Sequence, residues 1–209
     1  MELKDRIIQE ASTLFFRNGI KSITMSDIAI YLGISKRTLY EVFKDKEELL
    51  RACIDYHTSC AIKEREEILS KAENVIDTMM LAYAKHLNDA HSANKSLWHD
   101  LKKYHPQIYQ QITKQQGDEM NDFLPLLKKG IEQGLIRAEI NPEICLWLIK
   151  SQFKTLLEGD LAIDDKYSIN QFVRAIILNF TRGIATTKGN ELIDNTIKRF
   201  RESEQNNNV

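Results

Sequence analysis

Apolar residues recur along most of this chain at the three- and four-residue spacing of an amphipathic helix. In the first segment, Ile7, Ala11, Leu14 and Phe15 fall on one helical face. No segment sustains the alternation of apolar and polar residues that is typical of a strand. Because the 209 residues also include only eight Gly and three Pro, the pattern predicts an all-α fold.

Turn and cap residues near the N-terminus divide this pattern into short helices. Gly19 ends the first helix, and Thr24 with Asp27 three residues later has the spacing of a capping box. Gly33 ends the second helix and Ser35 caps the third. Helices are therefore expected at 3–18, 25–32 and 36–42, with a longer fourth helix at 46–70.

Longer helical segments follow residue 70, and the chain ends in a polar stretch. Pro106 and Pro142 suit the first turn of a helix, where the N–H that proline lacks is not needed. The polar residues at 204–209 are expected to form a disordered tail. Helices are predicted at 73–91, 95–104, 106–133, 142–158, 168–186 and 190–202.

The composition, 43% hydrophobic and 28% charged residues, is ordinary for a globular protein. The longest apolar run, at 144–149, is much shorter than the roughly 20 residues of a membrane span. The N-terminus lacks a secretory signal pattern, and three Cys do not make a disulfide framework. We therefore expect a cytoplasmic protein that has no membrane partner.

Residues 24–46 have the order of a helix-turn-helix, in which the second helix enters the DNA major groove. Leu39 and Phe43 would face the core and leave a cationic, hydroxylated side outward. Residues 17–46 carry six cationic and three acidic side chains, a local charge of +3 in a chain of net charge −1. A helical hairpin with a solvated basic face is the alternative. The residues expected to contact DNA are Ser35, Lys36, Arg37, Thr38, Tyr40, Lys44 and Lys46.

Several of these side chains suit a particular part of DNA. Arg37 and Lys36 can donate to guanine O6 and N7, and the methyl group of Thr38 can contact thymine. Tyr40 and Lys46 suit phosphates, which position a protein without specifying sequence. Glu41 either accepts a hydrogen bond from a cytosine amino group or is simply solvated.

Residues 6–51 resemble the DNA-binding domain of the TetR family of bacterial transcriptional regulators. The resemblance implies a homodimer with an N-terminal three-helix helix-turn-helix domain at 1–48, helix 46–70 as a linker, and a ligand-binding and dimerisation bundle at 49–203. It assigns phosphate contacts to Tyr40 and Lys46 and adds Thr24 and Ser26 to the groove-facing positions. The matching residues include Ala11, Leu14, Phe15, Gly19, Thr24, Ile28, Ala29, Gly33, Ser35, Thr38, Leu39, Tyr40, Phe43, Lys46 and Leu49.

The segments at 142–158 and 168–186 are apolar on more than one side, so each needs covering on more than one side. One face can pack within the chain and another against a second copy, as the TetR resemblance implies. A deep core within a monomer is the alternative. The residues expected in a dimer interface are Phe153, Leu156, Leu157, Phe172, Ile176 and Phe180.

A ligand pocket of a helical bundle is mostly apolar, with a few polar groups. The residues that suit such a pocket also suit an ordinary core, and they do not specify the charge of a ligand. The effector therefore stays unidentified. The candidates are Met79, Met80, Tyr83, His86, Trp98, Tyr104, Phe123 and Trp147.

Cys53, His57 and Cys60 fall on one face of the helix at 46–70, where thiolates and imidazole could sense a metal or an oxidant. No fourth metal ligand is evident. The two Cys are about 10 Å apart along the helix axis, too far for a disulfide. Two buried Cys with a surface His are the alternative, and no metal site is predicted.

No combination of nucleophile, base and orienting residue is evident, so we expect neither an enzyme nor a cofactor. The expected function is that of a ligand-responsive transcriptional regulator, a repressor that binds a palindromic double-stranded operator as a homodimer. A small-molecule effector would release it. The alternative is the same fold acting as a non-regulatory module that sequesters a small molecule or a protein.

Overall fold

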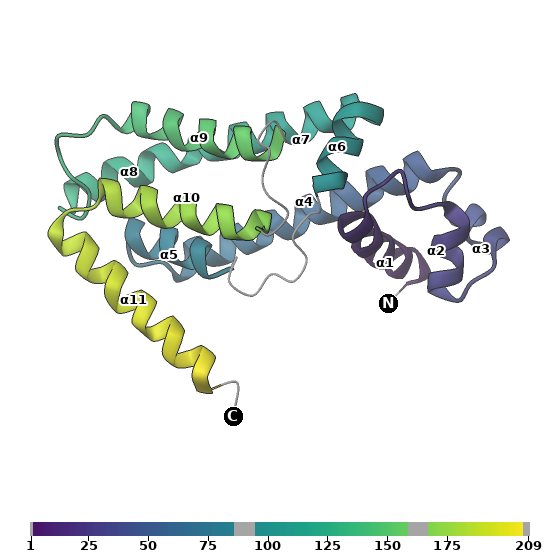
Figure 1. Ribbon diagram of the computed structural model, residues 1–209, viewed down its shortest axis with the longest axis horizontal. Coiled ribbons are helices and arrows are strands. Elements are labelled where there is room, and N and C mark those ends of the chain that lie inside the picture. Colours follow the sequence, from purple (N-terminus) through teal and green to yellow (C-terminus); the bar gives the residue numbers. More distant parts are fainter. Residues whose placement is uncertain (1, 86–94, 159–166, 207–209) are drawn as a thin grey trace. The chain divides into compact units, whose positions relative to one another are not determined.

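The computed structural model describes residues 2–85, 95–158 and 167–206, and it is built from helices (Figure 1). The all-α prediction is confirmed. Within the described ranges, the strand-like pairing is a single isolated bridge between Ile136 and Ala185. The elements are α1 (Leu3–Asn18), α2 (Met25–Leu32), α3 (Lys36–Val42), α4 (Lys46–Lys71), α5 (Val75–Lys85), α6 (Lys95–Tyr104), α7 (Pro106–Glu119), the 3-10 turn η1 (Met120–Asp122), α8 (Phe123–Glu132), α9 (Pro142–Glu158), α10 (Ile169–Ile184) and α11 (Thr187–Asn206).

The structure departs from the predicted helices mainly within 106–133 and in the C-terminal helix, which begins at Thr187 instead of residue 190. The end of the helix predicted at 73–91 lies outside the described residues beyond Lys85. The segment expected as one helix at 106–133 is interrupted by η1, just before Pro125. Within a continuous helix, Pro125 would lack a hydrogen bond and its ring would meet the carbonyl four residues earlier, whereas the first turn of α8 tolerates it. At the C-terminus, α11 continues to Asn206, three residues into the expected tail, and 207–209 lie outside the described residues.

The chain divides into two compact units. The N-terminal unit comprises 1–66 and 90–112, and the C-terminal unit comprises 67–89 and 113–209. The sequence placed a boundary at residue 48, whereas here most of α4, all of α6 and the start of α7 belong with the first three helices. Contacts between residues distant in the chain decide this grouping, because α6 packs against α1.

The core of the N-terminal unit forms where α1, α2, α3 and the first turns of α4 meet α6. Phe15, Leu39 and Phe43 are all buried there. Leu97 and Leu101, four residues apart on one face of α6, complete the same cluster. The helix-turn-helix therefore shares a continuous apolar core with α6.

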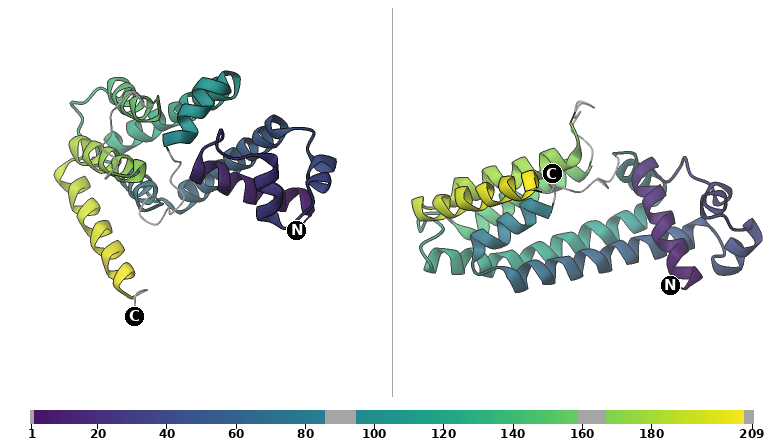
Figure 2. Two further views of the ribbon diagram at one scale, coloured as in Figure 1. Left: turned by 45° about the vertical axis from the view of Figure 1, so that its right-hand side comes forward. Right: turned by 90° about the horizontal axis from the view of Figure 1, so that it is seen from below.

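The C-terminal unit is a bundle in which α10 lies between α5 and α9 (Figures 1 and 2). Its core includes Ile76 and Met80 of α5, Leu127 of α8 and Ile193 of α11, all buried. α11 packs against α5 through the residues around Ile193. None of the helices in the described ranges is long and apolar enough to cross a membrane.

Candidate nucleic-acid interface

The first helix of the motif, α2, begins at a complete capping box. The backbone N–H of Asp27 donates to Thr24 Oγ1 at 3.2 Å, and the backbone N–H of Thr24 donates to Asp27 Oδ2 at 2.8 Å. The Thr24 hydroxyl also donates to Asp27 Oδ2 at 2.6 Å. The hydrogen bonds from Thr24 lower the pKa of the Asp27 carboxyl below its ordinary value. These bonds fix the start of α2, where Thr24 is exposed.

The turn between the two helices depends on Gly33. Its φ of 66° and ψ of 30° place it in the left-handed region, which residues with a Cβ adopt at a cost. The Gly33 N–H donates to the Ile30 carbonyl, and the Ile34 N–H donates to the Ala29 carbonyl at 3.0 Å. Ile34 then packs on the core, so the turn and the core together set the direction in which α3 leaves.

α3 is seven residues long and is held by its N-cap and one buried side chain. Ser35 Oγ accepts from the Thr38 N–H at 3.0 Å and lies 2.8 Å from the Thr38 hydroxyl. Leu39 is the residue of α3 that is fully buried. An isolated helix of this length is unstable in water, so its position depends on these two anchors and on Phe43 immediately after it.

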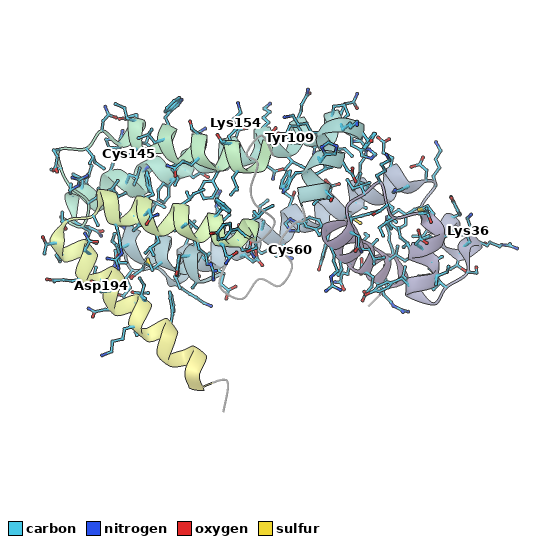
Figure 3. The ribbon with its side chains drawn as sticks, in the orientation of Figure 1. Lys36, Cys60, Tyr109, Cys145, Lys154 and Asp194 are labelled. Atoms are coloured by element: carbon cyan, nitrogen blue, oxygen red, sulfur yellow. The ribbon has the colours of Figure 1, made fainter. Side chains whose placement is uncertain are left out.

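The outward side of α3 carries two pairs of side chains at i, i+4 spacing. The Lys36 ammonium lies 5.9 Å from the centroid of the Tyr40 ring, and Arg37 Nε donates to Glu41 Oε1 at 2.9 Å. Figure 3 shows Lys36 projecting away from the ribbon. Among the expected DNA contacts, Thr24, Ser35, Lys36, Arg37, Tyr40 and Lys44 are exposed, whereas Ser26, Thr38 and Lys46 are half-buried.

Lys46 has a structural role that its place in the sequence did not suggest. Its Nζ donates to the Ile20 carbonyl at 2.5 Å and lies 5.9 Å from the centroid of the Phe15 ring. Burial lowers the pKa of the ammonium, and the nearby carboxylates of Asp100 and Asp27 offset part of that effect. Lys46 therefore ties α4 to the turn before α2.

Asp100 of α6 binds the same turn. Asp100 Oδ2 accepts from the backbone N–H groups of Ile20 at 2.8 Å and Lys21 at 2.7 Å, and the residue is only 7% exposed. Gly19, with φ of 81°, allows this approach. A Cβ there would lie 2.9 Å from Ser96 Cβ and 3.2 Å from Asp100 Oδ2. Sequence reasoning missed Asp100, because a carboxylate 80 residues away gives no local signal.

The residues proposed for a ligand pocket are divided between the two units. Trp98 and Tyr104 belong to the N-terminal unit, where Trp98 packs on the core and Tyr104 is exposed. In the C-terminal unit, Met79 and Met80 are buried, and Tyr83 and Phe123 are half-buried. Trp147 of the same unit is 67% exposed. His86 lies outside the described residues. The structure therefore groups Met79, Met80, Tyr83 and Phe123 with one core.

The residues proposed for a dimer interface lie on α9 and α10, with different exposures. Leu156 is buried, and the side chain of Leu157 lies outside the described set. Phe153, Phe172, Ile176 and Phe180 are half-buried. The exposed apolar side chains of α9 lie nearer its start, at i, i+3 and i+4, and they are Ile144, Trp147 and Leu148.

Cys53, His57 and Cys60 have separate environments. Cys53 is buried, with its Sγ 3.5 Å from the Ile8 carbonyl, and Cys60 is half-buried. His57 stacks on Phe16, with ring centroids 4.3 Å apart. In the part of the chain that the structure describes, no three His, Cys, Asp or Glu side chains form a group that could hold a metal.

We predict that Cys53 reacts slowly with iodoacetamide in the folded protein. Burial raises the pKa of its thiol to about 12, and the thiolate is the nucleophile. A raised pKa also means that the folded state holds this proton more tightly, so this group's contribution to stability is lost as pH rises from 9 towards 12. Mass spectrometry of native and urea-unfolded protein at pH 8 measures the labelling. Labelling of native Cys53 as fast as Cys60 would contradict the prediction.

Comparison with known proteins places this motif in a family. Residues 7–53 match the family model described as "Bacterial regulatory proteins, tetR family". The chain belongs to the TetR family. The matched range runs from Ile7 of α1 to Cys53 of α4, and so contains the helix-turn-helix, both of its caps and Lys46.

Relatives of this TetR-family protein extend the likeness beyond the matched range. The uncharacterized HTH-type transcriptional regulator YvaF of Bacillus subtilis is 25% identical over 180 residues, which cover 86% of this chain and 94% of YvaF. The biofilm operon icaADBC negative transcriptional regulator IcaR of Staphylococcus epidermidis is 24% identical over 158 residues, covering 66% and 85%. A TetR-family regulator structure from Agrobacterium tumefaciens has the same fold, with a TM-score of 0.69, 16% identity and coverage of 88% and 97%. This TetR-family protein is a DNA-binding transcriptional regulator.

Proposed function

We propose that this TetR-family regulator represses transcription by binding a palindromic operator as a homodimer, and that a small-molecule effector releases it. The observation that carries this proposal is the outward side of α3, where Lys36, Arg37 and Tyr40 are exposed while Leu39 is buried. That division matches the chemistry of a helix inserted into a major groove. As a DNA-binding protein, it would act in the bacterial cytoplasm, where operator DNA lies.

The proposed contacts separate into base readers and phosphate binders. Arg37, Lys36 and Thr38 lie in the first turn of α3, which leads into the groove. Ser35 and Thr24 lie at the N-termini of α3 and α2, where free backbone N–H groups attract phosphate. We assign the remaining phosphate contacts to Ser26, Tyr40, Lys44 and Lys46.

A second copy of the chain would supply a second α3, and the two-fold axis between the copies would match the two-fold symmetry of an inverted repeat. The exposed row of Ile144, Trp147 and Leu148 supports α9 as part of the dimer surface. We propose that this row joins the residues predicted from the sequence, Phe153, Leu156, Leu157, Phe172, Ile176 and Phe180. Repression is supported by the description of IcaR as a negative regulator.

We propose that the effector binds in the C-terminal unit, close to Met79, Met80, Tyr83 and Phe123. Two helices link that unit to the DNA-binding unit, since α4 spans the division at Glu66 and α7 spans it at Ile112. An effector that prefers one arrangement of these helices shifts the population towards it. Release of DNA follows if that arrangement no longer fits two successive half-sites. The function requires binding, and no step of it requires catalysis.

Selection of bound duplexes from a random DNA pool tests this function. A dimeric regulator is expected to enrich a short inverted repeat whose half-sites are separated by a whole number of helical turns. Enrichment of no common sequence would contradict the proposal and would favour a protein that sequesters a small molecule or another protein. A single unrepeated half-site would contradict the dimer alone.

We predict that Lys44→Ala weakens binding to the selected operator and to unrelated duplexes by the same factor. Lys44 is exposed and follows α3, so it suits a phosphate, and its loss should reduce the slope of log affinity against log salt by about 1. Fluorescence anisotropy between 50 and 200 mM salt measures that slope. Lys46→Ala is the less useful variant, because Lys46 also holds the Ile20 carbonyl. A change confined to the operator would show that Lys44 reads a base instead.

A further inference from the structure

The pairing of Arg37 with Glu41 gives Glu41 a role that the sequence left open. Arg37 Nε lies 2.9 Å from Glu41 Oε1, and the two side chains are 89% and 60% exposed on the outward side of α3. Leu39 faces the core between them. The carboxylate therefore lies where α3 would meet DNA, and it already has a partner on the same helix.

The hydrogen bond from Arg37 Nε to Glu41 limits which donors of Arg37 can contact a base. A guanidinium is a planar fork with five N–H donors. It can approach the O6 and N7 atoms of guanine through Nε and one terminal nitrogen, or end-on through both terminal nitrogens. With Nε–H committed to Glu41, the end-on edge is the pair of donors left for guanine.

Electrostatics and entropy both favour this role over independent action by Glu41. A carboxylate alone in a groove lined with phosphates is repelled, whereas its pairing with Arg37 makes the two side chains neutral together. An exposed ion pair contributes little to folding. It does, however, restrict an arginine that otherwise has many rotamers, so that less entropy is lost when the base is bound.

The neighbouring pair lacks this property. Lys36 lies over the Tyr40 ring, and an ammonium is a point charge without a preferred edge. Lys36 can approach a phosphate or a base acceptor equally well. Arg37 is therefore the cation of α3 whose direction is fixed by a side chain of the same helix.

We propose that Glu41 is a positioning residue that commits Arg37 to end-on recognition of a guanine in the operator. The assignment rests on the proposed function, because it requires α3 to enter the major groove. It predicts that Glu41 contributes to specificity through Arg37 and makes no base contact of its own.

The test uses the operator from the random pool and a copy that carries 7-deazaguanine, which lacks the N7 acceptor. The guanine to modify is the one whose replacement weakens binding of the unaltered protein but does not change the affinity of the Arg37→Ala variant. For the unaltered protein, the modification should weaken binding about tenfold. For Glu41→Ala, operator affinity should fall about threefold to tenfold, and the penalty for 7-deazaguanine should shrink below about threefold.

Three further variants make the result specific. Glu41→Gln keeps an oxygen that can accept from Nε and should restore part of the 7-deazaguanine penalty. In the Arg37→Ala background, Glu41→Ala should no longer weaken operator binding, and loss of the now unpaired carboxylate should leave the affinity unchanged or raise it. Glu66→Ala removes an exposed carboxylate from α4 and should match the unaltered protein on both duplexes.

Two outcomes would overturn the assignment while leaving the proposed function intact. If Glu41→Ala bound both duplexes more tightly, and by the same factor, Glu41 would only repel phosphates. A changed preference at a cytosine, persisting in the Arg37→Ala background, would mean that Glu41 reads a base itself. Failure of the pool to yield any common sequence would instead remove the proposed function, and the role of Glu41 with it.

Discussion

Replacing Asp100 with alanine is expected to lower the unfolding free energy of the N-terminal unit by about 3 kcal/mol. The change leaves the Ile20 and Lys21 N–H groups without their acceptor, and the first of these bonds is buried. It also removes a carboxylate that stabilises the half-buried Lys46 ammonium. The turn that precedes α2 would lose its attachment to α6, so operator affinity should fall as well.

The two tryptophans allow the affected unit to be followed separately. Trp98 lies in the N-terminal unit and Trp147 in the C-terminal unit, so urea unfolding of the Asp100→Ala variant in a Trp147→Phe background reports the N-terminal unit. Asp100→Asn, which keeps one acceptor oxygen, should lose less stability. Asp55→Ala, at an exposed carboxylate of α4, should change it by less than about 0.5 kcal/mol. Equal effects of Asp55→Ala and Asp100→Ala would show that Asp100 does not hold the turn.

Leu39→Ala is the second large effect that we expect, about 2–5 kcal/mol of unfolding free energy. Leu39 is completely buried in the shared core and is the fully buried residue of the seven in α3. A cavity at this position removes the main contact that orients α3. Operator binding should therefore be lost even under conditions in which the rest of the N-terminal unit stays folded.

Hydrogen exchange of the α3 amides and a gel shift with the selected operator measure the two consequences of Leu39→Ala. Ile30→Ala is a matched control on α2, because Ile30 is 78% exposed and the same type of side chain is removed. It should leave both the exchange rates and the operator affinity near those of the unaltered protein. Retention of full operator affinity by Leu39→Ala would mean that the cap at Ser35 and Phe43 are enough to hold α3.

The sequence predicted the helix-turn-helix closely because its information is local. Thr24 with Asp27, Gly33 and Ser35 each act within a few residues, and the structure shows the capping box, the left-handed glycine and the N-cap at these positions. The i, i+4 spacing of Leu39 and Phe43 likewise predicted their burial. Each of these signals depends on backbone geometry that is complete within one or two helical turns.

Side-chain pairing was less predictable, even within one helix. Glu41 stands four residues after Arg37, a spacing that permits an ion pair, yet the sequence left it either as a reader of cytosine or as a solvated carboxylate. The structure joins it to Arg37 Nε. The choice between the partners depends on rotamers, which the sequence does not specify.

By itself, the sequence determined the helices of the DNA-binding motif, the side of α3 that faces the core and the family to which the chain belongs, since repeating apolar positions and caps act over short distances. Only the tertiary structure decided that α6 joins the N-terminal unit, that Asp100 binds the turn at Ile20 and that Lys46 holds the same turn. These contacts bring together residues that are 26 to 80 positions apart. Folding chooses among many such distant partners by the burial and hydrogen bonding of the whole core, which no local pattern records.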